Sequence, residues 1–242
     1  MLQTSIVCAT YKRFDHFREL VDSVRVSFPK GSYEIVAVSS DPVGSSKYDW
    51  MKSQPDVVTI SAGVRNEGEH RSRSLYSYEN IGLKHASGEW MFVTNDDTKI
   101  EHDFHTVLTQ MEKEWDVIMV NGHLGDVGLG CRTAVIGDVT PPDGATRPLY
   151  LYDFTVIRRS VYERIGWLDE GLDWFGKGFD LAMACETANP PLRVCYSSSL
   201  RVNHSISPEN RFPPHYVRDF RYATDKWNSW CAKNNWKYNW PW

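Results

Sequence analysis

The sequence lacks the features that mark several large classes of protein. Five cysteines are spread widely over 242 residues, with no CxxC pair and no disulfide-like spacing. This usage disfavours a disulfide scaffold and favours a reducing, cytosolic setting. Long basic runs are missing as well, and the formal net charge is −4. Charge therefore gives no reason to expect nucleic acid as a partner.

Long apolar runs are also missing. No run approaches the roughly 20 apolar residues that a bilayer-spanning helix needs. Residues 1–16, MLQTSIVCATYKRFDH, contain no basic region followed by an apolar one, as a secretory signal would. We expect a soluble, cytoplasmic protein without a transmembrane segment.

What is present is ordinary globular composition, with 41% hydrophobic and 24% charged residues. The length suits one large α/β domain, and the chain shows neither internal repeats nor a clear linker. Ten tryptophans and twelve tyrosines are an unusual number. Such side chains stack on sugar rings as readily as they fill cores.

Short apolar runs alternate with amphipathic segments, which predicts an α/β fold with a mostly parallel sheet. Strand 5–9, helix 15–26 and strand 33–38 make a unit of about 30 residues, the usual length of a βαβ crossover. Further strands are expected at 57–60, 90–93, 117–120, 149–157, 192–196 and 200–204, and further helices at 75–85, 104–115, 159–165, 180–187 and 216–231. Residues 65–73 and 121–146 are expected to be loops, the second with a short hairpin, and the tail 236–242 to be irregular.

The most informative stretch is the acidic end of the expected strand at 90–93. The apolar run gives way to Thr94-Asn95-Asp96-Asp97-Thr98. Adjacent carboxylates need a cation or strong donors unless they lie where a strand of an open sheet runs out, which is also where such sheets bind ligands. Hard oxygen ligands there suit Mg²⁺ or Mn²⁺. A solvated turn with ordinary Asn and Asp turn chemistry explains the same residues.

The segment from Asn80 to Trp90, NIGLKHASGEW, resembles the NxGlxxAxGe(Y/W) segment that precedes the metal motif of GT-A glycosyltransferases, family-2-like members in particular. In that family the following strand ends in an Asp-x-Asp triplet, which falls here on Asn95-Asp96-Asp97. The resemblance continues through residues 152–170, then Gly176-Lys177-Gly178-Phe179-Asp180, and ends near Val202-Asn203-His204. It covers most of the chain, from about residue 5 to 204.

The resemblance implies a single GT-A (Rossmann-like) domain over residues 1–242, with a mixed, mostly parallel central sheet flanked by helices. Residues 1–100 would form the nucleotide-binding half, 101–207 the acceptor half and 208–242 an aromatic C-terminal extension. It also implies roles for individual residues. Asp97 and His204 would hold Mn²⁺ or Mg²⁺, and Asp96 would face the donor ribose or a metal-bound water.

Two positions depart from the family pattern. Asn95 stands where the family carries an acid, so it brings an amide oxygen but no charge. The usual Glu-Asp pair is absent, and a gap-free alignment places it on Lys177-Gly178. We expect Asp180 to act as the general base, because it is the carboxylate of this block. The alternative is that Asp180 only caps the helix that it begins.

The remaining candidates are assigned by position in the chain. The acceptor candidates Trp167, Trp174 and Phe175 are equally explicable as core aromatics, His204 as a core histidine at a strand end, and the arginines at 71 and 73 as a solvated loop. The candidates for binding the nucleotide sugar are Thr10, Tyr11, Arg13, Asp41, Arg71, Arg73, Asn80, Asn95 and Asp96.

The predicted function is a metal-dependent, inverting glycosyltransferase. Its partners would be a UDP- or GDP-sugar donor and a glycan or glycoprotein acceptor. A retaining enzyme of the same fold and an inactive carbohydrate- or nucleotide-binding relative remain open. A sugar-phosphate nucleotidylyltransferase is disfavoured, because that class has a glycine-rich loop after its first strand and Thr10–Phe14 contains no glycine.

Overall fold

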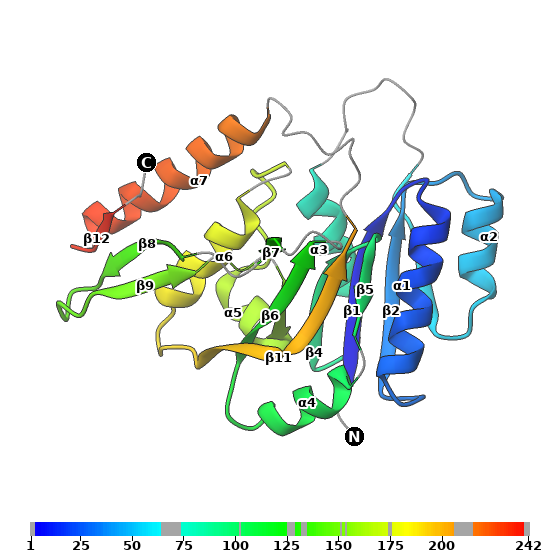
Figure 1. Ribbon diagram of the computed structural model, residues 1–242. Helices are drawn as coiled ribbons and strands as arrows, with labels where there is room; N and C mark the ends of the chain where they lie inside the picture. The colour runs from blue at the N-terminus through cyan, green and yellow to red at the C-terminus, as the bar shows by residue number, and fades with distance from the viewer. Residues whose placement is uncertain are drawn as a thin grey trace.

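The computed structural model describes residues 3–63, 74–101, 103–124, 129–131, 135–150, 152, 154–173, 176–205 and 215–239. Within these ranges a central nine-stranded sheet lies between two layers of helices, and a small three-stranded sheet lies beside it (Figure 1). None of the described helices is long and apolar enough to cross a membrane.

The strands of the central sheet run in the order β3-β2-β1-β4-β10-β6-β11-β5, and β7 pairs with β6. Strands β3, β2, β1 and β4 are mutually parallel, β10 is antiparallel to both of its neighbours, and β6 and β11 are parallel. The predicted mixed, mostly parallel sheet is confirmed. The strands are β1 (Thr4–Thr10), β2 (Tyr33–Ser39), β3 (Val57–Ser61), β4 (Trp90–Asn95), β5 (Thr98–Ile100), β6 (Val117–Leu124), β7 (Leu129–Cys131), β10 (Thr155–Arg158) and β11 (Val194–His204).

Helices cover both faces of this sheet because alternate residues of each strand point to opposite sides. Ile6 and Cys8 of β1 face one core, and Val7 between them faces the other. The first core is covered by α1 (Phe14–Ser27), α2 (Ser46–Ser53) and α4 (Phe104–Met111), and the second by α3 (Leu75–His85), α5 (Arg159–Ile165), α6 (Lys177–Glu186) and α7 (His215–Lys233).

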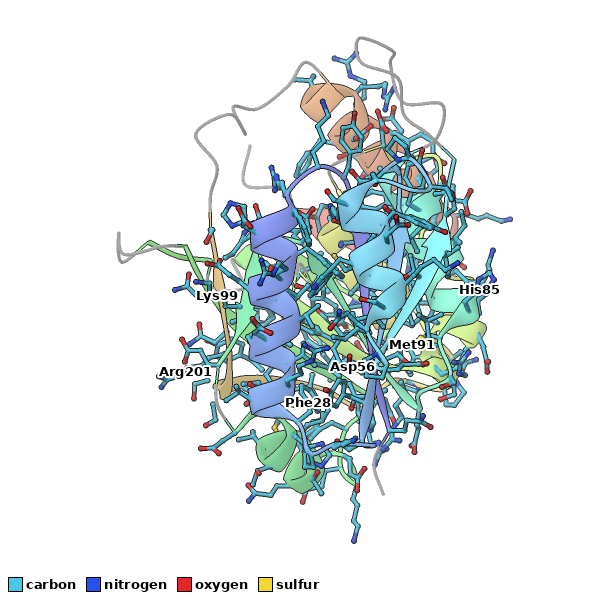
Figure 2. All side chains as sticks on the ribbon, turned by 90° about the vertical axis from the view of Figure 1, so that its right-hand side faces the viewer. Phe28, Asp56, His85, Met91, Lys99 and Arg201 are labelled. Carbon is cyan, nitrogen blue, oxygen red and sulfur yellow. The ribbon has the colours of Figure 1, made fainter. Side chains whose placement is uncertain are left out.

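Figure 2 shows the first of these faces, with α1 and α2 side by side in front of the strands. Phe28, at the end of α1, packs against Phe104 of α4 with ring centroids 5.7 Å apart. Lys99 of β5 and Arg201 of β11 lie on one side of the view, where these two strands pair antiparallel, and His85 of α3 lies on the opposite side. Strands from residues 4–100 and from residues 117–204 belong to this one sheet.

Helix α2 was not predicted from the sequence. Its N-cap is Ser45, whose hydroxyl accepts a hydrogen bond from the Tyr48 backbone N–H. Tyr48 and Met51 are buried against the first core, but eight residues are too few to show a clear helical period. The Ser45 cap was the available signal.

Four expectations about the second half were wrong in whole or in part. In residues 121–146 the expected short hairpin is present, since β6 continues to Leu124 and pairs antiparallel with β7, but β8 (Val135–Thr140) stands where only loop was expected. The single strand expected at 149–157 is two strands in different sheets, β9 (Arg147–Tyr150) and β10. The two strands expected at 192–204 are one, β11, whose pairing shifts between Ser197 and Arg201. In the tail, β12 (Lys237–Asn239) pairs with β8.

Candidate functional site

The polar ends of three parallel strands meet at one edge of the sheet. Thr10 at the end of β1 is in register with Ser39 at the end of β2, and Ala9 is in register with Asn95 at the end of β4. The turn after β4 carries Asp96 and Asp97. Strand β11 brings His204 to the same place, paired with Thr98 of β5. The expected convergence of residues 10, 95–97 and 204 is what the structure shows.

Asp96 is a buried carboxylate held by side chains of the β1–α1 turn. Its Oδ2 accepts a hydrogen bond from Thr10 Oγ1 at 2.9 Å, and its Oδ1 lies 3.4 Å from Arg13 Nη1. Burial raises the pKa of Asp96, although the Thr10 hydrogen bond and the Arg13 charge oppose that shift. The charge of Asp96 therefore depends on the cations around it.

Asp97 has both carboxylate oxygens engaged. Oδ1 lies 3.0 Å from His204 Nε2, and Oδ2 accepts a hydrogen bond from Arg13 Nη1 at 2.6 Å. The Asp97 carbonyl also accepts from the Ser205 N–H, which ties the end of β11 to the acidic turn. Burial raises the pKa of Asp97, but His204 and Arg13 outweigh burial and hold it below the ordinary value. Asp97 is thus an ionised carboxylate at neutral pH.

His204 Nε2 lies within hydrogen-bond distance of one acceptor and one donor. Asp97 Oδ1 is an acceptor, whereas Asn95 Nδ2, 3.1 Å away, is a donor. A protonated Nε2 satisfies the carboxylate, and a bare Nε2 satisfies the amide. With its amide turned by 180°, Asn95 would present its oxygen to the same nitrogen. The Phe154 ring packs edge-on to the imidazole, with centroids 5.4 Å apart.

This donor set fits a divalent cation. Asp97 Oδ1 and His204 Nε2 lie 3.0 Å apart, and a carboxylate oxygen and an imidazole nitrogen are both ligands that such an ion could take. The described ranges hold no cluster of three or more His, Cys, Asp or Glu side chains placed for a metal. Mg²⁺ and similar ions usually take one or two protein ligands and complete their shell with phosphate and water. Asp97 and His204 are therefore the residues that would hold such an ion.

A third carboxylate, Asp41, lies near Asp96 and Asp97. Asp41 follows β2; its Oδ1 accepts from the Lys12 backbone N–H at 3.0 Å, and its Oδ2 lies 3.1 Å from Lys47 Nζ. The same ammonium donates to Thr10 Oγ1 at 2.6 Å. Lys47 thus connects Asp41 through Thr10 to Asp96. Arg13 and Lys47 face three carboxylates in this acid cluster, which we define as Thr10, Arg13, Asp41, Lys47, Asn95, Asp96, Asp97 and His204.

Asp180 belongs to a different set of contacts. It lies in the first turn of α6, and its Oδ1 accepts from Lys226 Nζ at 2.7 Å and from Trp227 Nε1 at 2.6 Å, both on α7. Lys226 also pairs with Asp169 at 2.6 Å. Burial raises the pKa of Asp180, and Lys226 opposes the shift. A carboxylate with a raised pKa suits proton transfer, but α7 already occupies one of its oxygens.

Asp180 lines a cleft of about 480 Å³ together with two other predicted residues, Asn80 and Trp167. The Asn80 side chain is fully used within the protein: Nδ2 donates to Leu168 O and Glu170 Oε1, and Oδ1 accepts from Leu168 N. Among the described residues that line this cleft, none belongs to the acid cluster. The structure therefore divides the predicted site residues between two places.

Trp167 stands in the left-handed backbone region with φ of 68°, and its ring stacks on Tyr162 at a centroid distance of 6.0 Å. Beside the cleft, Lys177 stands where the sequence resemblance expects an acid. Its ammonium pairs with the buried Glu79 of α3 at 3.1 Å. At this position the resemblance expects a carboxylate on α6. Here α6 carries the cation, Lys177, and the carboxylate of the ion pair is Glu79 on α3.

The other predicted residues can be placed briefly. Tyr11 is partly buried in the β1–α1 turn, with the Lys12 ammonium 5.3 Å from its ring centroid. Arg71, Arg73, Trp174 and Phe175 lie outside the described residues. Sequence reasoning missed Lys47, Lys226 and Trp227, because buried lysines and helix-face tryptophans look like any others until the fold shows their partners.

No family model and no curated protein matches the chain. Solved structures do match. The structure of residues 1–349 of TarS from S. aureus superposes with a TM-score of 0.65 at 18% identity, over 93% of this chain and 65% of that one. The same TarS residues with UDP-GlcNAc give 0.67 at 14% identity, over 93% and 66%.

GalNAc-T7, crystallised with UDP, GalNAc and Mn²⁺, gives a TM-score of 0.66 at 15% identity, over 93% of this chain and 48% of that one. The chain thus spans about half to two thirds of the length of these structures. Both neighbours are GT-A glycosyltransferases. At such low identity the likeness establishes the fold, and the expected GT-A fold is confirmed.

Proposed function

We propose that this chain is a glycosyltransferase that moves a sugar from a nucleotide-diphosphate donor to a hydroxyl of a glycan or glycoprotein acceptor. The observation that carries the proposal is the acid cluster at the carboxyl ends of β1, β2 and β4, where open α/β sheets bind ligands. The neighbours of the same fold were crystallised with UDP, UDP-GlcNAc or Mn²⁺, which favours a UDP-sugar over a GDP-sugar.

The proposed roles follow from charge and position. Asp97 and His204 hold Mn²⁺ or Mg²⁺, which supplies positive charge beside the departing diphosphate when bound. Asp96, Thr10, Asp41 and the neighbouring polar residues bind the nucleotide. Asp97 would contribute a carboxylate oxygen and His204 an imidazole nitrogen, and the two atoms already lie 3.0 Å apart. The other proposed nucleotide-sugar contacts are Tyr11, Arg13, Arg71, Arg73 and Asn95. Asn80, expected from the sequence to be one, is left out because its side chain bonds Leu168 and Glu170 at the other cleft.

The acceptor side is proposed around α6. Asp180 would take the proton of the acceptor hydroxyl in an inverting transfer, and Trp167, Trp174 and Phe175 would contact the acceptor.

The domain division proposed is 1–100 for the donor, 101–207 for the acceptor and 208–242 as a C-terminal extension. We propose a reducing, cytoplasmic setting, because the five cysteines are widely spread along the sequence without a disulfide-like spacing.

The test is release of UDP or GDP from a panel of nucleotide sugars, with and without Mn²⁺. We expect Mn²⁺-dependent hydrolysis of at least one donor, and loss of both hydrolysis and Mn²⁺-dependent nucleotide binding in Asp97→Ala. Asp49→Ala, on the exposed face of α2, is the matched control and should behave as the unaltered protein. Failure of every donor to bind or react, with or without Mn²⁺, would exclude the proposal.

A second candidate is a relative of the same fold that binds a nucleotide or carbohydrate without turnover. Two observations favour it. Lys226 and Trp227 both donate hydrogen bonds to the Asp180 carboxylate. Lys177, paired with Glu79, stands where the resemblance expects an acid. Saturable UDP-sugar binding with no hydrolysis and no transfer would select this candidate. Transfer with retention of anomeric configuration would instead select a retaining enzyme that needs no such base.

A further inference from the structure

Arg13 forms an ion pair with Asp97, the carboxylate proposed to bind the metal ion. Its Nη1 lies 2.6 Å from Asp97 Oδ2 and 3.4 Å from Asp96 Oδ1. The other oxygen of Asp97 lies 3.0 Å from His204 Nε2. Asp97 therefore has its negative charge balanced by a side chain of its own protein before any ligand arrives.

The two partners of this pair differ in their freedom to move. The Asp97 side chain is only 2% exposed, whereas that of Arg13 is 33% exposed. Arg13 is the N-cap residue of α1 and makes no side-chain capping bond there. The turn beneath it is anchored separately, by the hydrogen bond from Lys12 N to Asp41. The guanidinium can thus swing away while Asp97 and the turn stay in place.

A bound diphosphate would offer the Arg13 guanidinium an alternative anionic partner to Asp97. Arginine pairs with phosphate through two parallel N–H···O bonds, and charge-assisted bonds of this kind are among the strongest in proteins. A divalent cation on Asp97 would repel a guanidinium 2.6 Å from the same carboxylate. Arg13 and the cation are therefore competitors for Asp97 until a diphosphate engages Arg13.

We propose that Arg13 is the resident counter-ion of Asp97, and that a bound nucleotide diphosphate draws it away and opens Asp97 to the divalent cation. The inference rests on the proposed function, since it takes a nucleotide diphosphate as the ligand of this site. Binding of cation and nucleotide then becomes mutually dependent, each tightening the other by the same factor. The protein avoids holding a cation where no nucleotide is bound.

The test compares Arg13→Met with the unaltered protein in two separate titrations. Mn²⁺ alone is followed by the electron paramagnetic resonance signal of the free ion, and UDP alone by calorimetry in the presence of a chelator. We expect Arg13→Met to bind Mn²⁺ about tenfold more tightly and UDP about tenfold more weakly, within the usual range of coupling between sites. A general folding defect would weaken both.

Arg18→Met is the matched control, because Arg18 lies on the same helix with its guanidinium over the rings of Phe14 and Trp50. It should leave both affinities unchanged. Arg13→Gln gives the same comparison if the Met variant is unstable. Mn²⁺ affinity that is unchanged or weaker in the Arg13 variants would overturn the inference. If no protein binds UDP, the proposed function fails, while the Mn²⁺ titration still decides the role of Arg13.

Discussion

The proposed role of Asp180 as a general base and its observed contacts with α7 favour different interpretations of this residue. Its carboxylate lies beneath α7 and accepts hydrogen bonds from Lys226 and Trp227 on one oxygen. Burial raises its pKa, as a general base requires, but Lys226 stabilises the ionised form. A residue with only a structural role would show the same contacts, so a substitution must separate the two.

We predict that Asp180→Asn spares UDP-sugar binding and lowers transfer by about 10²- to 10⁴-fold, the usual contribution of a general base. The Asn side chain keeps the shape and can still accept from Trp227. The control is Asp169→Asn, which breaks the other ion pair of Lys226 but removes no proposed base. Transfer rates and binding of a non-hydrolysed donor check the prediction. Full transfer in Asp180→Asn, or equal losses in both variants, would contradict it.

At the scale of single residues, sequence reasoning identified every member of the acid cluster except Lys47, but not the contacts between them. Asp97 and His204 were assigned to one site from their order in the chain, and the structure brings them within 3.0 Å. Lys47 was missed, because a lysine at the start of an unpredicted helix gives no sign of burial. Its ammonium is nevertheless the link between Asp41 and Thr10.

At the scale of elements, α3 packs directly against β1 and β2, two of the strands whose ends form the acid cluster. Gly82 lies in the middle of α3, where a Cβ would come within 2.5 Å of Val7 Cγ1 on β1 and 3.0 Å of Val38 Cγ2 on β2. Intrinsic helix propensity favours Ala over Gly by about 1 kcal/mol. The close approach acts against that preference.

We predict that Gly82→Ala destabilises the protein by about 1–3 kcal/mol, the usual cost of overpacking a core, despite the better helix former. Urea unfolding measures the change. Lys84→Ala, at an exposed position of the same helix, is the control and should change stability by less than about 0.5 kcal/mol. A stabilised Gly82→Ala would mean that α3 can move away from β1 and β2 at no cost.

Element boundaries show where local patterns were sufficient. The segments that became β1, α1, β2, β3 and α3 were predicted within about two residues, because each lies in the regular α/β half with clear periodicity. The segment 149–157 was not. Leu149 pairs within the small sheet and Thr155 pairs with β6, and no local pattern tells which strand a residue will meet.

For the whole molecule, the pH dependence of stability follows from two arginine–aspartate ion pairs between segments far apart in the chain. Asp56 accepts from Arg25 of α1 at 2.7 and 2.9 Å, and Asp116 accepts from Arg193 at 2.7 and 2.9 Å. The arginine hydrogen bonds lower the pKa of both carboxyls more than burial raises it. A carboxyl with a lowered folded pKa adds stability above the unfolded pKa of about 3.9, and this is lost as pH falls through the folded value.

We predict that the urea midpoint falls as pH is lowered from about 5 to 2, and that Asp116→Asn reduces both the midpoint at neutral pH and this acid loss. Asp49→Asn, at an exposed position, is the control and should follow the unaltered protein. Carboxyls with a raised pKa, such as Glu79, act with the opposite sign, because their protonation favours the folded state. An acid loss in Asp116→Asn equal to that of the unaltered protein would contradict the prediction.

The sequence by itself determined the alternation of strands and helices and the residue types available at the strand ends. Those depend on local periodicity and on the cost of burying charge, both of which can be read along the chain. Only the tertiary structure decided which charges meet. Arg13 lies on Asp97, Lys47 joins Asp41 to Thr10, and Lys226 covers Asp180, since each pairing depends on contacts between segments far apart in the chain.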